Sequence, residues 1–320
     1  MHENSTLELI QQIANLLEDK YVFPDVGKQV ADHLRQWVDE NKPLPSPPEL
    51  ADMLNETFTS LTHDSHLRID YDPKRASGGN NTEQLMQRHF EKALRNNFGF
   101  LKVERLAGNI GYLKIQEFSP PEPAMTLAAG AMAFVANTQG LIFDIRGHKG
   151  GTPEMVQLLI SYLVDEKPQS LTGIYSRETD QTEAFFTLEE IPGKRMNNVP
   201  VYIIVDGKTH SAGEAFAYDL QALKRAIIIG TRTRGGAHLV EFMPLMGMYV
   251  FVLPIARAIN PITNSNWQGT GVIPDIEVTD QDPLMIAHRC ILNEVLNSVT
   301  DDSEMEFLQT ELKTLTPLPS

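Results

Sequence analysis

The amino-terminal third of the chain repeats apolar residues with the period of an amphipathic helix. Apolar side chains recur every three or four positions from Leu9 to Leu17, and the same spacing returns over 26–37 and 50–61. This spacing gathers the apolar side chains on one face of a helix. We therefore expect three helices, followed by a short strand where LRIDYD, 67–72, alternates between apolar and polar residues.

From about residue 100 the pattern changes to short, continuous apolar runs. GLIFD, VYIIV and AIIIG are each joined to a stretch with helical periodicity, and LKVERL and NIGYLKI flank an Ala-Gly-Asn turn. Uninterrupted Val and Ile runs that alternate with helices are typical of a parallel sheet covered on both faces. The sequence predicts an α/β core that opens with a hairpin and gains late strands from MYVFVL and the segment around Ile276.

These patterns divide the chain into four segments. We expect an N-terminal helical subdomain over 1–72, a connecting loop and helix over 73–100, an α/β core over 101–280, and a C-terminal helical tail over 281–320. A chain of 320 residues can form one large domain or two modest ones.

Composition and charge narrow the possible partners. The formal charge of −15 argues against binding to nucleic acid or to an anionic membrane surface. A single cysteine, Cys290, excludes an internal disulfide, and no apolar run approaches the ~20 residues of a membrane span. The opening MHENSTLELI lacks a signal-peptide pattern, so we expect a soluble protein, cytoplasmic as written and periplasmic or secreted if a signal was trimmed. No cofactor or metal site is predicted.

The stretch KTHSAGEAFAY places Ser211 at the start of a predicted helix. Serine there is either an N-cap or a nucleophile, because the unpaired amides of a helix start stabilise an anion. If Ser211 attacks a carbonyl, the N–H of Ala212 lies beside the resulting oxyanion. Cap statistics alone favour the cap.

A second candidate segment is DIRGHKGGT, where a buried strand runs into paired glycines. Gly150 and Gly151 can aim backbone amides into a cleft, although a glycine turn between a strand and a helix is common without any catalytic role. Asp144 and Arg146 are interpreted as a structural pair that ties this loop in place.

A third segment, THDSHLRIDY, offers His66 beside Ser65. A lone histidine in a loop is usually a surface residue, and four others compete with it as a base: His63, His148, His210 and His238. Lys149 and Lys208 could act as the base in place of a histidine, but most lysines are simply exposed at the surface.

Five segments taken in order resemble one family of serine peptidases. They are YVFPD, AGNIGYLKIQEF, LIFDIRGHKGG, THSAGEAFAYDLQALKRAIIIGTRTRGGA and NWQGTGVIPDIEV, and they extend from about residue 10 to 280. The chain resembles the family that holds the C-terminal-processing, or tail-specific, proteases, the tricorn core protease and the interphotoreceptor retinoid-binding protein modules. The resemblance implies a crotonase/ClpP-like spiral core, with the active site between the helical part and the core.

The resemblance also implies which catalytic residues to expect. The processing proteases use a Ser–Lys dyad, but this chain has Gly236 in the segment that carries their lysine, and the space before residue 106 is too short for their PDZ domain. The tricorn-like branch pairs a serine nucleophile with Ser–His and a glutamate. Ser65 and His66 match that pair, whereas Gln268 stands where the family usually has the glutamate.

The expected reaction is therefore peptide hydrolysis through an acyl-enzyme on Ser211. His66 would be the general base, Ser65 and Gln268 would orient the polar network, and Gly150 or Gly151 would join Ala212 as oxyanion donors. A neutral amide at 268 would slow the reaction by ~10- to ~10⁴-fold unless another group substitutes. One alternative is a non-catalytic module that binds a retinoid or lipid. The last is a crotonase-type acyl-coenzyme A enzyme, but this chain shows no evident basic patch to hold the coenzyme phosphates.

Overall fold

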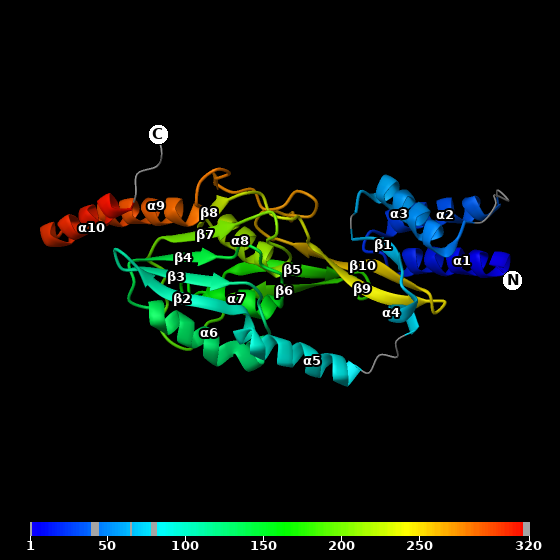
Figure 1. The fold of residues 1–320 in the computed structure, drawn as a ribbon, viewed down its shortest axis with the longest axis horizontal. Helices are drawn as coiled ribbons and strands as arrows, with labels where there is room; N and C mark the ends of the chain where they lie inside the picture. The colour runs from blue at the N-terminus through cyan, green and yellow to red at the C-terminus, as the bar shows by residue number, and fades with distance from the viewer. Residues whose placement is uncertain (1, 40–44, 65, 78–81, 316–320) are drawn as a thin grey trace. The chain divides into compact units, whose positions relative to one another are not determined.

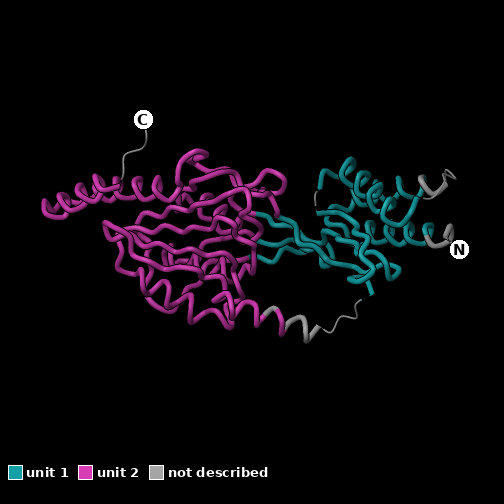
Figure 2. The backbone as a smooth tube through the Cα atoms, in the orientation of Figure 1, with its two compact units in different colours: residues 1–85, 173–184, 237–259 teal, residues 86–172, 185–236, 260–320 magenta. Residues whose placement is uncertain are grey.

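The computed structural model describes residues 2–39, 45–64, 66–77 and 82–315. Its helices and strands group into two compact units, which are coloured separately in Figure 2. Unit 1 comprises residues 1–85, 173–184 and 237–259, and unit 2 comprises residues 86–172, 185–236 and 260–320. Both units are assembled from segments that are separated in the sequence. The boundaries predicted at residues 72, 100 and 280 stay a prediction.

Unit 1 contains the amino-terminal helices and most of an antiparallel sheet (Figure 1). The helices are α1 (His2–Lys20), α2 (Pro24–Asp39), α3 (Pro47–Thr62) and α4 (Pro73–Ser77). The sheet has the order β1 (Arg68–Tyr71), β10 (Tyr249–Ile259), β5 (Ser170–Ser176), β6 (Gln181–Phe186), and β9 (His238–Leu245) also pairs with β10. The three helices and the strand predicted at the amino end are confirmed.

The core of unit 1 forms where the apolar faces of the helices meet the long strand β10. Leu9, Ile13 and Leu17 on α1 are fully buried in one cluster with residues of α3 and β10. Phe58 on α3 lies 5.9 Å from Phe251 on β10, measured between ring centroids. Because these apolar positions repeat at helical spacing, the sequence already indicated which face of each helix is buried.

Unit 2 is built on a six-stranded sheet. Its order is β11 (Ile276–Glu277), β8 (Ile227–Gly230), β7 (Val201–Val205), β4 (Gly140–Asp144), β3 (Ile110–Ile115), β2 (Phe100–Leu106). The β2–β3 hairpin is antiparallel and all other neighbours are parallel. Every residue of β4 and β7 is buried, as expected of central strands covered on both faces.

Helices complete unit 2. They are α5 (Thr82–Arg95), which begins in unit 1, the short η1 (Asn97–Gly99), α6 (Pro121–Val135), α7 (Pro153–Ser161), α8 (Ala212–Ala222), α9 (Pro283–Ser298) and α10 (Asp302–Thr314). The predicted α/β core with a helical amino-terminal part is confirmed. Among the described helices, none is both long and apolar enough to cross a bilayer.

The parallel pairing of β4 with β7 positions the candidate site. Leu141 pairs with Val201 and Asp144 pairs with Ile204, so the two strands end at the same edge of the sheet. The loops that follow, 145–152 and 206–211, are therefore neighbours. Ligands of open α/β sheets bind at this carboxyl edge. Both loops lie in segments that the sequence analysis named as candidates for the active site.

Candidate active site

Hydrogen bonds to backbone groups fasten the two loops to each other. Asp206 accepts the N–H groups of Gly147 at 2.9 Å and of Thr209 at 3.0 Å through the same carboxylate oxygen. The Thr209 hydroxyl donates to the carbonyl of Ile145 at 3.0 Å, and the N–H of His210 donates to the carbonyl of His148 at 3.0 Å. The loop that carries Ser211 is thus held against the glycine loop.

Ser211 has an unusual backbone conformation. Its φ of 54° and ψ of −122° lie in a region that non-glycine residues rarely adopt, and such strain clusters at functional sites. The residue directly precedes α8, and its side chain is half-buried rather than enclosed. Ala212 is the first residue of α8, so its N–H has no acceptor within the helix. The hydroxyl and the amide expected to act together therefore belong to one helix start.

Glu214 holds this helix start and is a residue that our sequence interpretation missed. Its carboxylate is fully buried and accepts the N–H of Ser211 at 2.8 Å. It also accepts the N–H groups of Gly235 at 2.6 Å and Gly236 at 2.9 Å, and the hydroxyl of Thr233 at 2.6 Å. Burial raises the pKa of Glu214, and these hydrogen bonds oppose the rise. The Ser-x-x-Glu spacing, which is the signature of a capping box, was the available signal.

Gly150 lies directly against the side chain of Ser211. A Cβ atom built on Gly150 would lie 2.9 Å from the Cβ and 3.2 Å from the Oγ of Ser211, and the φ of Gly150 is +101°. Glycine is therefore required at 150 for both backbone angle and space. The N–H of Gly150 donates to Nδ1 of His148 at 3.1 Å. The neighbouring Gly151, with φ +140°, is exposed.

His148 is buried beneath the two loops. Its ring centroid lies 4.2 Å from that of Phe118, and burial lowers its pKa to about 3. Because Nδ1 accepts from Gly150, the ring proton resides on Nε2, which has no hydrogen-bond partner within the described part of the chain. A neutral imidazole whose lone pair is already used is a poor general base.

The position of the missing dyad lysine is filled by an imidazole. A Cβ atom built on Gly236 would lie 2.2 Å from Nε2 of His210. No side chain fits at 236 unless His210 moves. Lys149 and Lys208, the possible replacement bases, are exposed.

Asp144 and Arg146 have the contacts of a structural pair. Asp144 is 1% exposed and accepts from Arg146 at 2.6 Å, from Lys114 at 2.7 Å and from the hydroxyl of Tyr112 at 2.9 Å. Burial raises the pKa of Asp144, but the hydrogen bonds from Arg146 and Lys114 outweigh it and hold the pKa below its usual range. The carboxylate thus anchors the end of β4.

The loop that contains Gln268 is attached to the segment 235–236. The indole N–H of Trp267 donates to the carbonyl of Gly236 at 2.9 Å, and the N–H of Gly269 donates to the carbonyl of Gly235 at 2.9 Å. Gln268 itself is half-buried, and its backbone N–H donates to the side-chain oxygen of Asn266 at 2.8 Å. The candidate residues Gly150, Ser211 and Gln268 all belong to unit 2.

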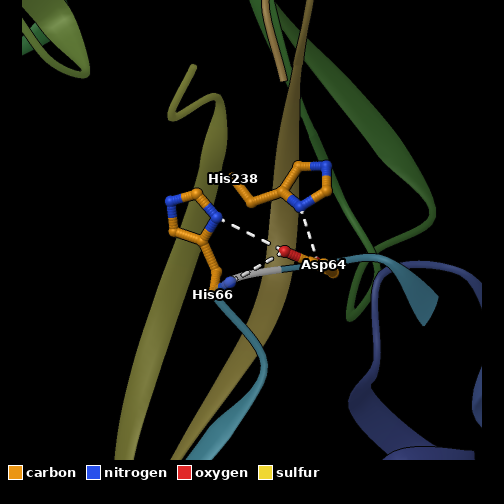
Figure 3. Close-up of side chains that lie close together, drawn as sticks. All are labelled: Asp64, His66 and His238. Atoms are coloured by element: carbon orange, nitrogen blue, oxygen red, sulfur yellow. Dashed lines mark hydrogen bonds and ion pairs between the residues drawn. The ribbon is translucent and has the colours of Figure 1, made fainter. Parts of the chain in front are cut away.

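His66 belongs to unit 1, where it has a carboxylate partner and a second imidazole beside it (Figure 3). Nδ1 of His66 lies 3.3 Å from Oδ1 of Asp64, and Nδ1 of His238 lies 2.9 Å from Oδ2 of the same carboxylate. Burial raises the pKa of Asp64, but the hydrogen bonds from His238 and His66 outweigh it and hold the pKa well below its usual range. Ser65, the predicted partner of His66, lies outside the described residues.

Comparison with known proteins shows which family the chain belongs to. A sequence model of peptidase family S41 matches residues 109–278, and a model of the N-terminal domain of these peptidases in eukaryotic IRBP matches residues 3–96. The chain belongs to peptidase family S41, which confirms the resemblance found in the sequence.

Individual relatives are more distant. The chain is 25% identical over 218 residues to the carboxy-terminal processing protease CtpB of Bacillus subtilis, covering 68% of this chain and 44% of that protein. It is 25% identical over 181 residues to a carboxy-terminal-processing protease of Bartonella bacilliformis, covering 54% of this chain and 40% of that one. The chain thus spans less than half the length of these curated relatives. The solved structure of a photosystem II D1 C-terminal processing protease shares the fold, with a TM-score of 0.58 at 15% identity over 86% of this chain and 93% of that one.

Proposed function

We propose that this chain is a serine-type peptidase that hydrolyses peptide bonds of protein substrates through an acyl-enzyme on Ser211. The observation that supports it most is the strained helix start at Ser211, with Gly150 packed against its hydroxyl. A hydroxyl presented in this way, beside an unpaired helix amide, has the requirements of a nucleophile with an oxyanion donor. Family membership favours this activity over the binding of a retinoid or lipid.

The steps follow from the chemistry of acyl transfer. Oγ of Ser211 attacks the peptide carbonyl carbon and passes its proton to His66, which returns that proton to the leaving amine. Water then attacks the acyl-enzyme, His66 takes one of its protons, and the acid is released as Ser211 regains the proton. The N–H of Ala212 stabilises the oxyanion, and Gly151 is the favoured second donor because the amide of Gly150 is bonded to His148.

Asp64 is proposed as the carboxylate that orients His66. The amide at Gln268 cannot supply a negative charge, whereas Asp64 is ionised and only 3.3 Å from Nδ1 of His66. A carboxylate on Nδ1 fixes the tautomer and leaves Nε2 as the proton acceptor. The expected penalty for a neutral residue at 268 is then removed.

The first test is covalent labelling of the purified chain with a serine-directed phosphonate. We expect one adduct by intact mass, and none in Ser211→Ala. A folded wild-type chain that stays unlabelled after prolonged exposure contradicts the proposal, and retention of retinoids or lipids in equilibrium dialysis would then support the binding alternative.

The second test separates the histidines. His66→Ala is expected to slow labelling by about 10²-fold or more, whereas His33→Ala, an exposed position on α2, leaves it unchanged. If labelling is lost in His238→Ala and stays normal in His66→Ala, His238 and not His66 is the general base. Gln268→Glu is expected to change turnover of a peptide library by less than about threefold, and a large gain would return the orienting role to position 268.

A further inference from the structure

Two histidines and one aspartate converge in unit 1 from distant parts of the sequence. Asp64 and His66 follow the end of α3, and His238 opens β9 (Figure 3). Both imidazoles present Nδ1 to the same carboxylate, one to each oxygen. One ligand atom from each of the three residues lies within 4.8 Å of the others.

The spacing of these atoms suits a small divalent cation. Zinc bonds to nitrogen and oxygen at about 2.0–2.2 Å, which places neighbouring ligand atoms of a tetrahedral site about 3.3 Å apart. In Asp64, Oδ1 lies 3.3 Å from Nδ1 of His66 and Oδ2 lies 2.9 Å from Nδ1 of His238. The ligand atoms are thus already within the range of separations that one ion spans.

Burial and second contacts favour a built site over a chance meeting of surface groups. The side chains of Asp64 and His238 are 5% and 4% exposed, and that of His66 is 17% exposed. The hydroxyl of Tyr21 donates to Oδ2 of Asp64 at 3.2 Å, and the ring of Phe23 lies 5.5 Å from that of His238. Outer contacts of this kind orient metal ligands, and the partial exposure of His66 leaves a side for water to complete the coordination.

We propose that Asp64, His66 and His238 form a binding site for a divalent transition metal of the zinc type. Two imidazoles and a carboxylate are the donor set that Zn²⁺ and its neighbours prefer, whereas Ca²⁺ and Mg²⁺ require more oxygen ligands than three residues supply. The site was invisible in the sequence because His238 is 174 positions from Asp64.

Occupation of the site has a consequence that rests on the proposed function. A metal that takes the Nδ1 lone pair of His66 moves the ring proton to Nε2. That nitrogen then has no lone pair to accept the proton of Ser211. Metal binding is therefore expected to silence the nucleophile, so the site regulates the reaction rather than carrying it out.

Metal binding is tested directly, without any activity measurement. The chelator-treated full chain is titrated with Co²⁺, and we expect one equivalent to bind with the visible absorption of a four- or five-coordinate site, displaced by Zn²⁺. His238→Ala and Asp64→Asn are expected to weaken Co²⁺ binding at least about tenfold, whereas His33→Ala, exposed on α2, does not. Absence of stoichiometric binding, or undiminished binding in both site variants, overturns the site.

Two further measurements keep the outcomes separate. Anomalous scattering at the zinc edge from wild-type crystals should place the ion among the three side chains. This measurement does not depend on variants, which could fail to fold. An ion located elsewhere overturns the site. Phosphonate labelling of Ser211 is then compared with and without saturating Zn²⁺, and we expect a loss of at least tenfold. Undiminished labelling of the metal-bound chain overturns the silencing, whereas no labelling of the metal-free chain contradicts the proposed peptidase and leaves the metal site standing.

Discussion

At the scale of single residues, two buried carboxylates hold the groups that surround the proposed chemistry. Asp64 accepts from His66 and His238, and Glu214 accepts from the backbone of Ser211 and from the segment 233–236. Neither acid touches the substrate in the proposed mechanism. Their proposed role is to fix the positions of His66 and Ser211, because each carboxylate bonds to several elements at once.

Asp64 is expected to make stability depend on pH in acid. Its pKa is held below that of the unfolded chain, so its contribution is present above about pH 4 and is lost as the pH falls. Asp64→Asn should lower the free energy of unfolding at pH 7 by about 1–3 kcal/mol and flatten its decline below pH 4. Urea unfolding at several pH values measures this, with the exposed Asp52→Asn as control. An unchanged acid slope contradicts the prediction.

Glu214→Gln should destabilise the protein although it is isosteric. Both carboxylate oxygens of Glu214 accept backbone N–H groups, so an amide must point its own N–H₂ at a donor. We expect a loss of about 2–4 kcal/mol in the free energy of unfolding together with slower labelling of Ser211. Glu154→Gln, at an exposed position in the first turn of α7, is the matched control. Equal stability of the two variants would remove Glu214 from its assigned role.

At the scale of elements, the parallel pairing of β4 and β7 brings the glycine loop and the serine loop to one edge. Taken alone, the glycine loop is an ordinary turn, and the serine loop is an ordinary helix cap. The hydrogen bonds of Asp206 and Thr209 then fasten the two loops together. Local sequence chooses the loop residues, and the register of the sheet makes them neighbours.

A pair of glycine variants separates backbone strain from contact with Ser211. Gly150 and Gly193 have similar φ values, +101° and +109°, but a Cβ atom meets Ser211 only at 150 and meets nothing within 4 Å at 193. Both alanine variants should lose about 1–3 kcal/mol of stability from the backbone angle. Only Gly150→Ala should also abolish phosphonate labelling of Ser211. Equal labelling of the two variants would show that Gly150 does not shape the site.

At the scale of the whole molecule, a second sheet was largely absent from the sequence interpretation. The strands β5, β6 and β9 were not predicted, whereas β10 was recognised through MYVFVL. β6 is mostly exposed, and β9 mixes exposed, half-buried and buried residues without a regular alternation. Such strands are defined by pairing with β10 or β5 rather than by their own composition.

The buried Asp219 is expected to affect stability in the opposite direction to Asp64. Burial raises its pKa to about 6, and hydrogen bonds from Thr172 and Asn260 oppose that rise. Since its pKa in the folded chain exceeds that of the unfolded chain, its favourable contribution is complete below about pH 4 and is lost as the pH rises towards 6. The loss is about 3 kcal/mol.

Asp219→Asn removes this titration and keeps the accepting oxygen. The N–H and hydroxyl of Thr172 and the side-chain amide of Asn260 all donate to the same oxygen, Oδ1. Urea unfolding between pH 4 and 7 should show a smaller decline in stability for the variant than for the wild type. Asp280→Asn, at an exposed position, should follow the wild type. A wild-type profile in Asp219→Asn would mean that another group titrates in this range.

Local sequence patterns were enough to predict the amino-terminal helices, the parallel strands of unit 2 and the place of Ser211 at a helix start. These features depend on apolar periodicity and on turn residues, and both patterns are contained within short segments of the chain. Three contacts depend instead on the fold: His238 lies beside Asp64 and His66, Glu214 accepts from Gly235 and Gly236, and His210 fills the space beside Gly236. Those contacts join residues up to 174 positions apart, and only the packing of the elements brings such residues together.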